Sequence, residues 1–118
     1  MKLAFTVRGR LAGYNELNTH WAKSARIKKE AMDVIGWSAR AAGINPVTRP
    51  VVITIRCFEP DARRDPDNVT SGAAKCVLDA LQNMGVLKND NRKHVTPRLP
   101  KPEVDRQNPR VEIEIVEI

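Results

Sequence analysis

Aromatic side chains are scarce in this chain of 118 residues, where they make up 4% of the sequence. A protein that binds single-stranded nucleic acid by stacking successive bases needs a row of aromatic side chains. The scarcity therefore excludes a stacking platform of that kind, and it predicts a core of aliphatic side chains. Apolar residues make up 42% and charged residues 29%, which is typical of a globular protein rather than a disordered chain.

Cysteine and long apolar runs are also nearly absent. Cys57 and Cys76 have neither the spacing of a zinc site nor the number of a disulfide framework, so we expect two reduced, buried thiols. No stretch is long and apolar enough to span a membrane, and Met1–Gly9 lacks the apolar region of a signal peptide. We therefore expect a cytoplasmic protein with no membrane partner.

Acidic residues are few in the first half of the chain. Residues 1–50 carry nine Lys and Arg against three Asp and Glu, whereas residues 51–118 carry eleven of each, so the net charge of +6 comes from the first half. Such a basic surplus attracts polyanions, most often nucleic acid. We expect Lys23, Arg26 and Lys29 of the first long helix to contact DNA, although the same residues would equally form the hydrated face of an ordinary helix.

Hydrophobic periodicity predicts one α/β (α+β) domain over residues 1–118, in the order β-α-β-α-β-β, with a mixed sheet and two packing helices. Strands are predicted at residues 3–7, 50–58, 93–98 and 110–118, and helices at residues 18–42 and from residue 69 or 71 to 84. Asn18 and Asn68 are the expected cap residues of the two helices. Trp21 is expected in the core or in a dimer interface.

The run RRDPDN, residues 63–68, places two carboxylates on either side of a proline. A residue before proline favours extended backbone, and residues i and i+2 of an extended segment point the same way. Asp65 and Asp67 are therefore expected to face one side, about 6.6 Å apart at the backbone. Such carboxylates repel each other unless a cation such as Mg²⁺ lies between them, although the pair would also serve as ordinary turn and cap residues.

Other charged residues extend this predicted site. Asp90 follows the second helix, and antiparallel packing of strand and helix would return it to Asp65 and Asp67. Three carboxylates on a basic surface are typical of metal-dependent phosphodiester hydrolysis. Cations are needed beside them to offset repulsion of a phosphate backbone, and the candidates are Arg63, Arg64 and Lys75.

The combination of RRDPDN, Lys75, LDAL (78–81), GVL (85–87) and Asp90 resembles the RusA family of Holliday junction resolvases. This likeness covers residues 61–90, about a quarter of the chain. The resemblance implies that Asp65, Asp67 and Asp90 bind Mg²⁺, or Mn²⁺, and that Lys75 is needed for cleavage. It also implies a bacterial or phage-encoded homodimer that cuts paired strands of a four-way DNA junction in recombination or repair.

Two other functions stay open at this point. Six residues, VTSGAA, separate Asn68 from Lys75, a longer spacing than in the shorter form of the family. This spacing motivates the hypothesis of a branched-DNA-binding module that has lost cleavage. A nuclease acting on flaps or other branched DNA is the third hypothesis.

Overall fold

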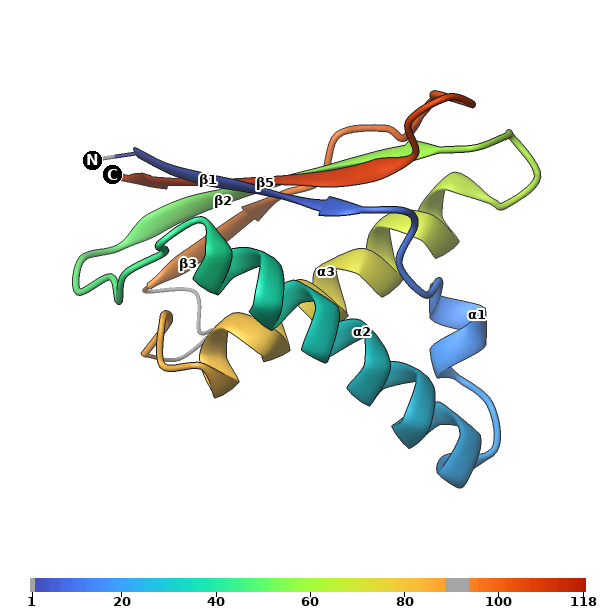
Figure 1. Ribbon diagram of the computed structural model, residues 1–118, viewed down its shortest axis with the longest axis horizontal. Coiled ribbons are helices and arrows are strands. Elements are labelled where there is room, and N and C mark those ends of the chain that lie inside the picture. Colours follow the sequence, from blue (N-terminus) through green and yellow to red (C-terminus); the bar gives the residue numbers. More distant parts are fainter. Residues whose placement is uncertain (1, 89–93) are drawn as a thin grey trace.

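The computed structural model describes residues 2–88 and 94–118. A mixed sheet carries helices on one face, with the two termini side by side at one end (Figure 1). The predicted α+β domain with a mixed sheet is therefore confirmed. The elements are β1 (Lys2–Arg8), α1 (Tyr14–Leu17), α2 (Trp21–Ala41), β2 (Val51–Glu59), α3 (Pro66–Asn83), β3 (Val95–Arg98), β4 (Glu103–Val104) and β5 (Arg110–Glu117).

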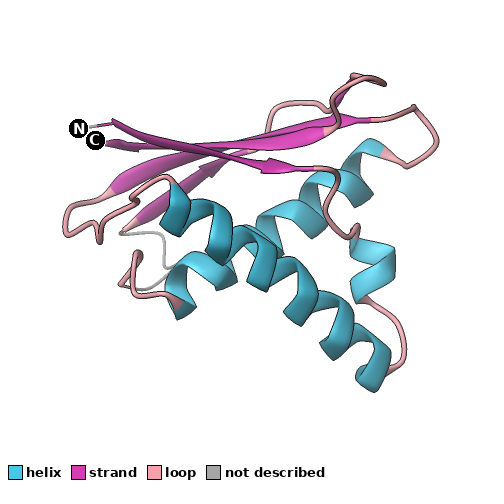
Figure 2. Ribbon diagram, in the orientation of Figure 1, coloured by secondary structure: helices cyan, strands magenta, loops and turns pink. Residues whose placement is uncertain are grey.

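The sheet has the order β1-β5-β2-β3, and β4 pairs with β2 beyond the end of β3. β5 runs antiparallel to both β1 and β2, whereas β3 and β4 run parallel to β2. α3 connects β2 to β3, because parallel neighbours need a crossover. Figure 2 shows α2 and α3 crossing each other beneath the sheet. Among the described residues, no helix has the length and apolar character needed to cross a membrane.

The core lies between the sheet and the two long helices. Alternate residues of the strands face it, as the period of two predicts, and α3 buries one full stripe. The predicted closing strand is confirmed, because its alternate apolar residues are buried while their neighbours remain partly exposed. The main buried side chains are Val51, Ile53 and Ile55 of β2, Val111, Ile113 and Ile115 of β5, and Val69, Ala73, Val77 and Leu81 of α3.

The predicted start of the first long helix is wrong. A separate short helix, α1, ends before Asn18, which is its C-cap, and α2 begins only at Trp21. The hydroxyl of Ser24 donates a hydrogen bond to the carbonyl of Leu17, which stabilises this break. Trp21 is 78% exposed and is not a core residue of the chain, because it is the first residue of α2 and this helix begins at its end farthest from the sheet (Figure 1).

Two glycines permit a close approach between α3 and the segment before α1. A Cβ atom at Gly72 would lie 2.2 Å from the carbonyl oxygen of Ala12, and one at Gly13 would lie 2.7 Å from the amide nitrogen of Asn68. Gly36 of α2 differs, because a Cβ atom there would meet only the sulfur of Met84, at 3.7 Å. Gly72 is therefore required by packing, because the atoms that its Cβ would meet belong to the backbone, whereas Gly13 faces side-chain atoms and Gly36 has room for a methyl group.

We predict that Gly72→Ala lowers the free energy of unfolding by about 3 kcal/mol, the upper end of the usual cost of overpacking. The matched control is Gly36→Ala, which adds a methyl group without a clash and should raise stability by about 0.5–1 kcal/mol through helix propensity. Urea unfolding followed by circular dichroism measures both. Equal stability of the two variants would contradict the close contact at Gly72.

Both cysteines are free and buried, as expected from the sequence. Removal from water raises the pKa of Cys57 and of Cys76 from 9.0 to about 11.

The reactive species is the thiolate, so we predict that neither thiol reacts with a disulfide reagent at pH 8 until the protein unfolds. Both thiols have a higher pKa in the folded than in the unfolded protein, so burial of the neutral thiols contributes its full stability below pH 9. The free energy of unfolding should fall as the pH rises toward 11. Rapid labelling of the native protein at pH 8 would argue against this.

Candidate metal and nucleic-acid site

The residues of the RRDPDN run lie at the start of α3, and Asp65 is the N-cap of that helix. Its carboxylate accepts a hydrogen bond from the backbone N–H of Asn68, at 3.1 Å. Pro66 occupies the first helical position, where its fixed φ suits the helix and its missing N–H has no cost. The prediction that Asn68 caps this helix is therefore wrong.

The extended geometry predicted for this run holds only at Asp65. Its backbone has ψ 133°, as expected before proline, but Asp67 already belongs to the first turn of α3. The two carboxylates are thus held by a helix start rather than by one face of an extended segment. The unpaired N–H groups of a helix N-terminus favour negative charge, so this position accommodates both carboxylates.

Asn68 instead forms a hydrogen bond with α1, the short helix before α2. Its side-chain oxygen accepts a hydrogen bond from the backbone N–H of Asn15, at 2.6 Å. The contact joins residues 53 positions apart in the sequence. Through it, α1 lies against the start of α3.

Arg64 forms the most buried ion pair of this region. Its Nε and Nη2 atoms donate to the two carboxylate oxygens of Glu59 at 2.7 and 2.9 Å, and its Nη1 donates to Glu16 at 2.9 Å. The side chains of Arg64 and Glu59 are only 12% and 7% exposed. Burial opposes the charge, but hydrogen bonds to Glu59 and the charges of Glu59 and Glu16 outweigh it and raise the pKa of Arg64. Arg64 is thus occupied by carboxylates.

Arg63 has the opposite environment. Its side chain is 89% exposed, and its contact with Asp61 is long, at 3.7 Å. An exposed pair of this kind contributes little to stability and breaks readily. Of the two neighbouring arginines, Arg63 is therefore the one placed to meet a phosphate.

Charge pairing sets Asp65 and Asp67 apart from the carboxylates around them. Glu16 and Glu59 pair with Arg64, and Asp61 pairs with Arg63. Within the described part of the chain, neither Asp65 nor Asp67 has an ion-pair partner, and both are exposed. Two exposed carboxylates without cations suit a hard, oxygen-preferring ion such as Mg²⁺.

The third predicted carboxylate, Asp90, lies outside the described residues. The residues that flank that segment, Lys88 and His94, lie beyond the C-terminal end of α3. The 18 residues of this helix separate its ends by about 27 Å. Among the described residues, no group of three His, Cys, Asp or Glu side chains comes together as a metal site. Joining Asp90 to Asp65 and Asp67 stays a prediction.

Lys75 lies two turns along α3 from the carboxylates. It follows Asp67 by eight residues, which corresponds to about 12 Å along the helix axis. Its exposed ammonium group lies 3.6 Å from Asp79. Asp79 also contacts Lys28 at 2.5 Å and thereby links α3 to α2. The structure therefore does not bring the Lys75 backbone next to Asp65 and Asp67.

The three residues of α2 predicted to contact DNA, Lys23, Arg26 and Lys29, are all exposed. Lys29 pairs with Asp33 at 3.0 Å, whereas no ion pair is formed by Lys23 or Arg26 among residues 2–88 and 94–118. Lys23 shares a hollow of about 290 Å³ with Asn15 and Glu16 of α1. Since those two residues contact Asn68 and Arg64, the start of α2 is coupled through α1 to the start of α3.

Glu59 was missed as a site residue by sequence reasoning. It continues the buried alternation of β2, after Val51, Ile53, Ile55 and Cys57. The sequence did carry a signal of this buried ion pair. Glu59 is a carboxylate at a core-facing position of the strand, and an arginine follows it five residues later.

Comparisons with known proteins add no family at this point: no protein-family model matches the chain, and no curated protein matches it. The resemblance to the RusA family therefore rests on the sequence motif alone.

We predict that Arg64→Ala lowers the free energy of unfolding by about 3–5 kcal/mol, because it leaves the buried Glu59 carboxylate without its partner. Arg63→Ala, one residue away, should change stability by less than about 0.5 kcal/mol. Urea unfolding of both variants tests this contrast. Similar small losses in the two variants would refute the buried pair.

Proposed function

We propose that the chain is a Mg²⁺-dependent endonuclease that cuts four-way DNA junctions. The observation that carries the proposal is the pair of exposed carboxylates at the start of α3, Asp65 and Asp67. They have no cationic partner among the described residues, although the neighbouring acids Glu16, Glu59 and Asp61 are all paired. The RRDPDN motif and its resemblance to the RusA family support the same assignment.

Asp65 and Asp67 would hold Mg²⁺ or Mn²⁺, and the sequence resemblance adds Asp90 as a third ligand. When bound, such an ion supplies activation of water and neutralisation of charge on the phosphate. Arg63 would contact a phosphate of the bound strand, and Lys23 and Arg26 would attract DNA toward the start of α2. Lys75 is assigned by resemblance to the charge that develops on cleavage. Its ammonium group would first have to leave Asp79.

A homodimer is part of this proposal. Resolution of a junction needs two paired cuts, and one copy of the chain offers one pair of carboxylates at α3. Two copies related by a two-fold axis would present the same site to both strands. The support for this assembly is the family resemblance.

We predict that the protein nicks a synthetic four-way junction in Mg²⁺. Asp67→Asn should reduce the cleavage rate at least about 100-fold. Removing a residue that only hydrogen-bonds to a metal ligand already lowers metal affinity or activity by up to about 100-fold, and Asp67 is a proposed ligand itself. Asp65→Asn should lose activity without unfolding α3, because asparagine caps helices as well as aspartate does. The matched control is Asp61→Asn, which removes a neighbouring carboxylate that pairs with Arg63 and should keep the activity.

Wild-type cleavage rates in Asp67→Asn and Asp65→Asn would refute the metal assignment. A linear duplex of the same sequence shows whether cutting depends on the junction. Flap and replication-fork substrates in the same assay distinguish a junction resolvase from a nuclease for other branched DNA.

A second candidate is a branched-DNA-binding module that does not cleave. It is favoured by the eight-residue separation between Asp67 and Lys75 and by the ion pair that Lys75 forms with Asp79. This candidate expects a gel shift with the junction, no product in Mg²⁺ or Mn²⁺, and no heat of metal binding in calorimetry. A metal-dependent product would rule it out.

A further inference from the structure

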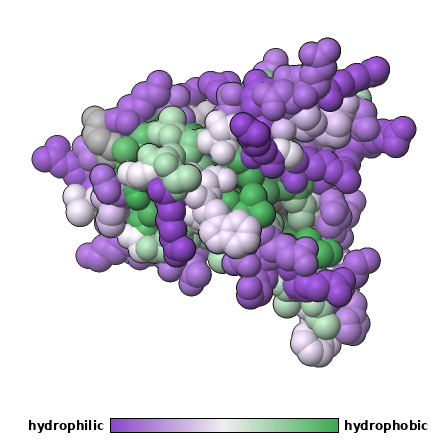
Figure 3. Space-filling view, viewed as in Figure 1, coloured by the Kyte–Doolittle hydropathy of each residue, from purple (hydrophilic) through white to green (hydrophobic). Residues whose placement is uncertain are grey.

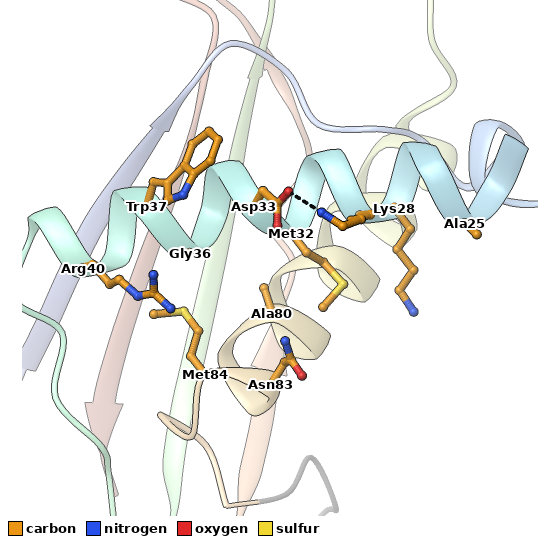
Figure 4. Close-up of a pocket in the computed structure, with 11 residues that line it drawn as sticks. Ala25, Lys28, Met32, Asp33, Gly36, Trp37, Arg40, Ala80, Asn83 and Met84 are labelled. Atoms are coloured by element: carbon orange, nitrogen blue, oxygen red, sulfur yellow. Dashed lines mark hydrogen bonds and ion pairs between the residues drawn. The ribbon is translucent and has the colours of Figure 1, made fainter.

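A groove of about 440 Å³ lies between α2 and the last turns of α3. Its floor is apolar and includes Met32 of α2 and Met84, which follows α3 (Figure 4). Trp37 and Arg40 lie at one end and Lys28 at the other, with the Asn83 amide on the α3 side. Figure 3 shows this face as apolar and weakly polar side chains edged by hydrophilic ones.

Trp37 lies at the Arg40 end of the groove, with its indole on the side of α2 away from α3 (Figure 4). Its side chain is 65% exposed, although burying an indole is strongly favourable. The scarcity of aromatic residues excludes a row of stacked bases, but one exposed indole is sufficient for one base. An aromatic face of this kind stacks on any nucleobase.

Gly36 keeps the groove open beside Trp37. Glycine inside a helix costs about 1 kcal/mol relative to alanine, and its backbone here does not have the positive φ that would require glycine. A Cβ atom would meet only the Met84 sulfur, at an ordinary contact distance of 3.7 Å. Packing therefore does not explain the glycine, whereas an open groove floor does.

The charges of the groove favour an anionic occupant. Lys28 pairs with Asp79, which also contacts Lys75, and Lys29 pairs with Asp33. Arg40 has no acidic partner in the described part of the chain, and it lies one helical turn from Trp37. The Arg40 end of the groove thus combines an exposed aromatic side chain with one guanidinium group that has no acidic partner among the described residues.

We propose that this groove binds one unpaired nucleotide of a DNA strand, with the base on the Trp37 indole and a phosphate on Arg40. The site is distinct from the carboxylates at the start of α3, because Ala80 follows Asp67 by 13 residues, which is about 20 Å along the helix. The choice of DNA rests on the proposed function, but the binding itself needs neither metal nor cleavage.

Fluorescence of Trp37 tests the proposal directly. In a Trp21→Phe background, Trp37 is the single tryptophan, and a short oligothymidylate in chelator should quench its emission in a saturable way. Trp37→Ala, measured by anisotropy of labelled oligothymidylate, should weaken binding about 5- to 150-fold, the range for loss of one base stack. Arg40→Ala should reduce the salt dependence of log affinity by about 0.7, as expected for one lost phosphate contact on a single strand.

Two variants separate the groove from general effects. Gly36→Ala keeps or raises stability but fills the floor, and it should weaken oligothymidylate binding several-fold. Trp21→Ala removes the other exposed tryptophan, which lies outside the groove, and should leave binding unchanged. Wild-type affinity in Trp37→Ala or in Gly36→Ala would overturn the proposal.

The remaining outcomes identify other occupants. Binding of a polyglutamate peptide as tight as that of oligothymidylate would overturn the base-recognition proposal in favour of an acidic peptide. A blue shift of Trp37 emission with rising protein concentration, without DNA, would overturn it in favour of a second copy. Asp65→Asn and Asp67→Asn should bind oligothymidylate normally, so loss of cleavage with intact binding defeats only the proposed nuclease activity.

Discussion

The buried ion pair between Arg64 and Glu59 is the interaction on which the rest of this structure depends. It connects the end of β2 to the loop before α3, and the added contact of Arg64 with Glu16 brings α1 to the same point. Two charges removed from water are tolerated only when their geometry and hydrogen bonds are nearly complete. The bidentate contact meets that requirement, and it fixes the loop that delivers Asp65 to the helix start.

The arrangement of acids and bases explains why the proposed functions fall where they do. Most carboxylates near α3 are neutralised by a basic side chain, which leaves Asp65 and Asp67 as the exceptions at its start. At the other end of α3, the cations of the neighbouring groove are compensated except for Arg40. The start of α3 is therefore suited to a cation, whereas the groove between its last turns and α2 is suited to an anion.

The structure of the motif at residues 63–68 was predicted from the sequence only in part. The sequence correctly located a charged loop between a strand and a helix. The cap of α3 was predicted wrongly as Asn68, although the sequence held the signal for Asp65: proline is favoured at the first helical position, so the residue before Pro66 is the N-cap. The prediction from the sequence also treated the two arginines alike, because Glu59 precedes both within five residues and only the folded loop shows which one meets it.

The sequence by itself determined the class of the fold, four of the five strands and most of the two long helices, because hydrophobic periods of two and 3.6 are local properties of a chain. It also determined the basic charge of the first half and the identity of the carboxylates. Tertiary structure alone decided which charges are neutralised: Glu59 and Glu16 approach Arg64 from five and 48 residues away. It also decided that Trp37, Gly36 and Asn83 line one groove, because α2 and α3 meet only when both pack on the sheet.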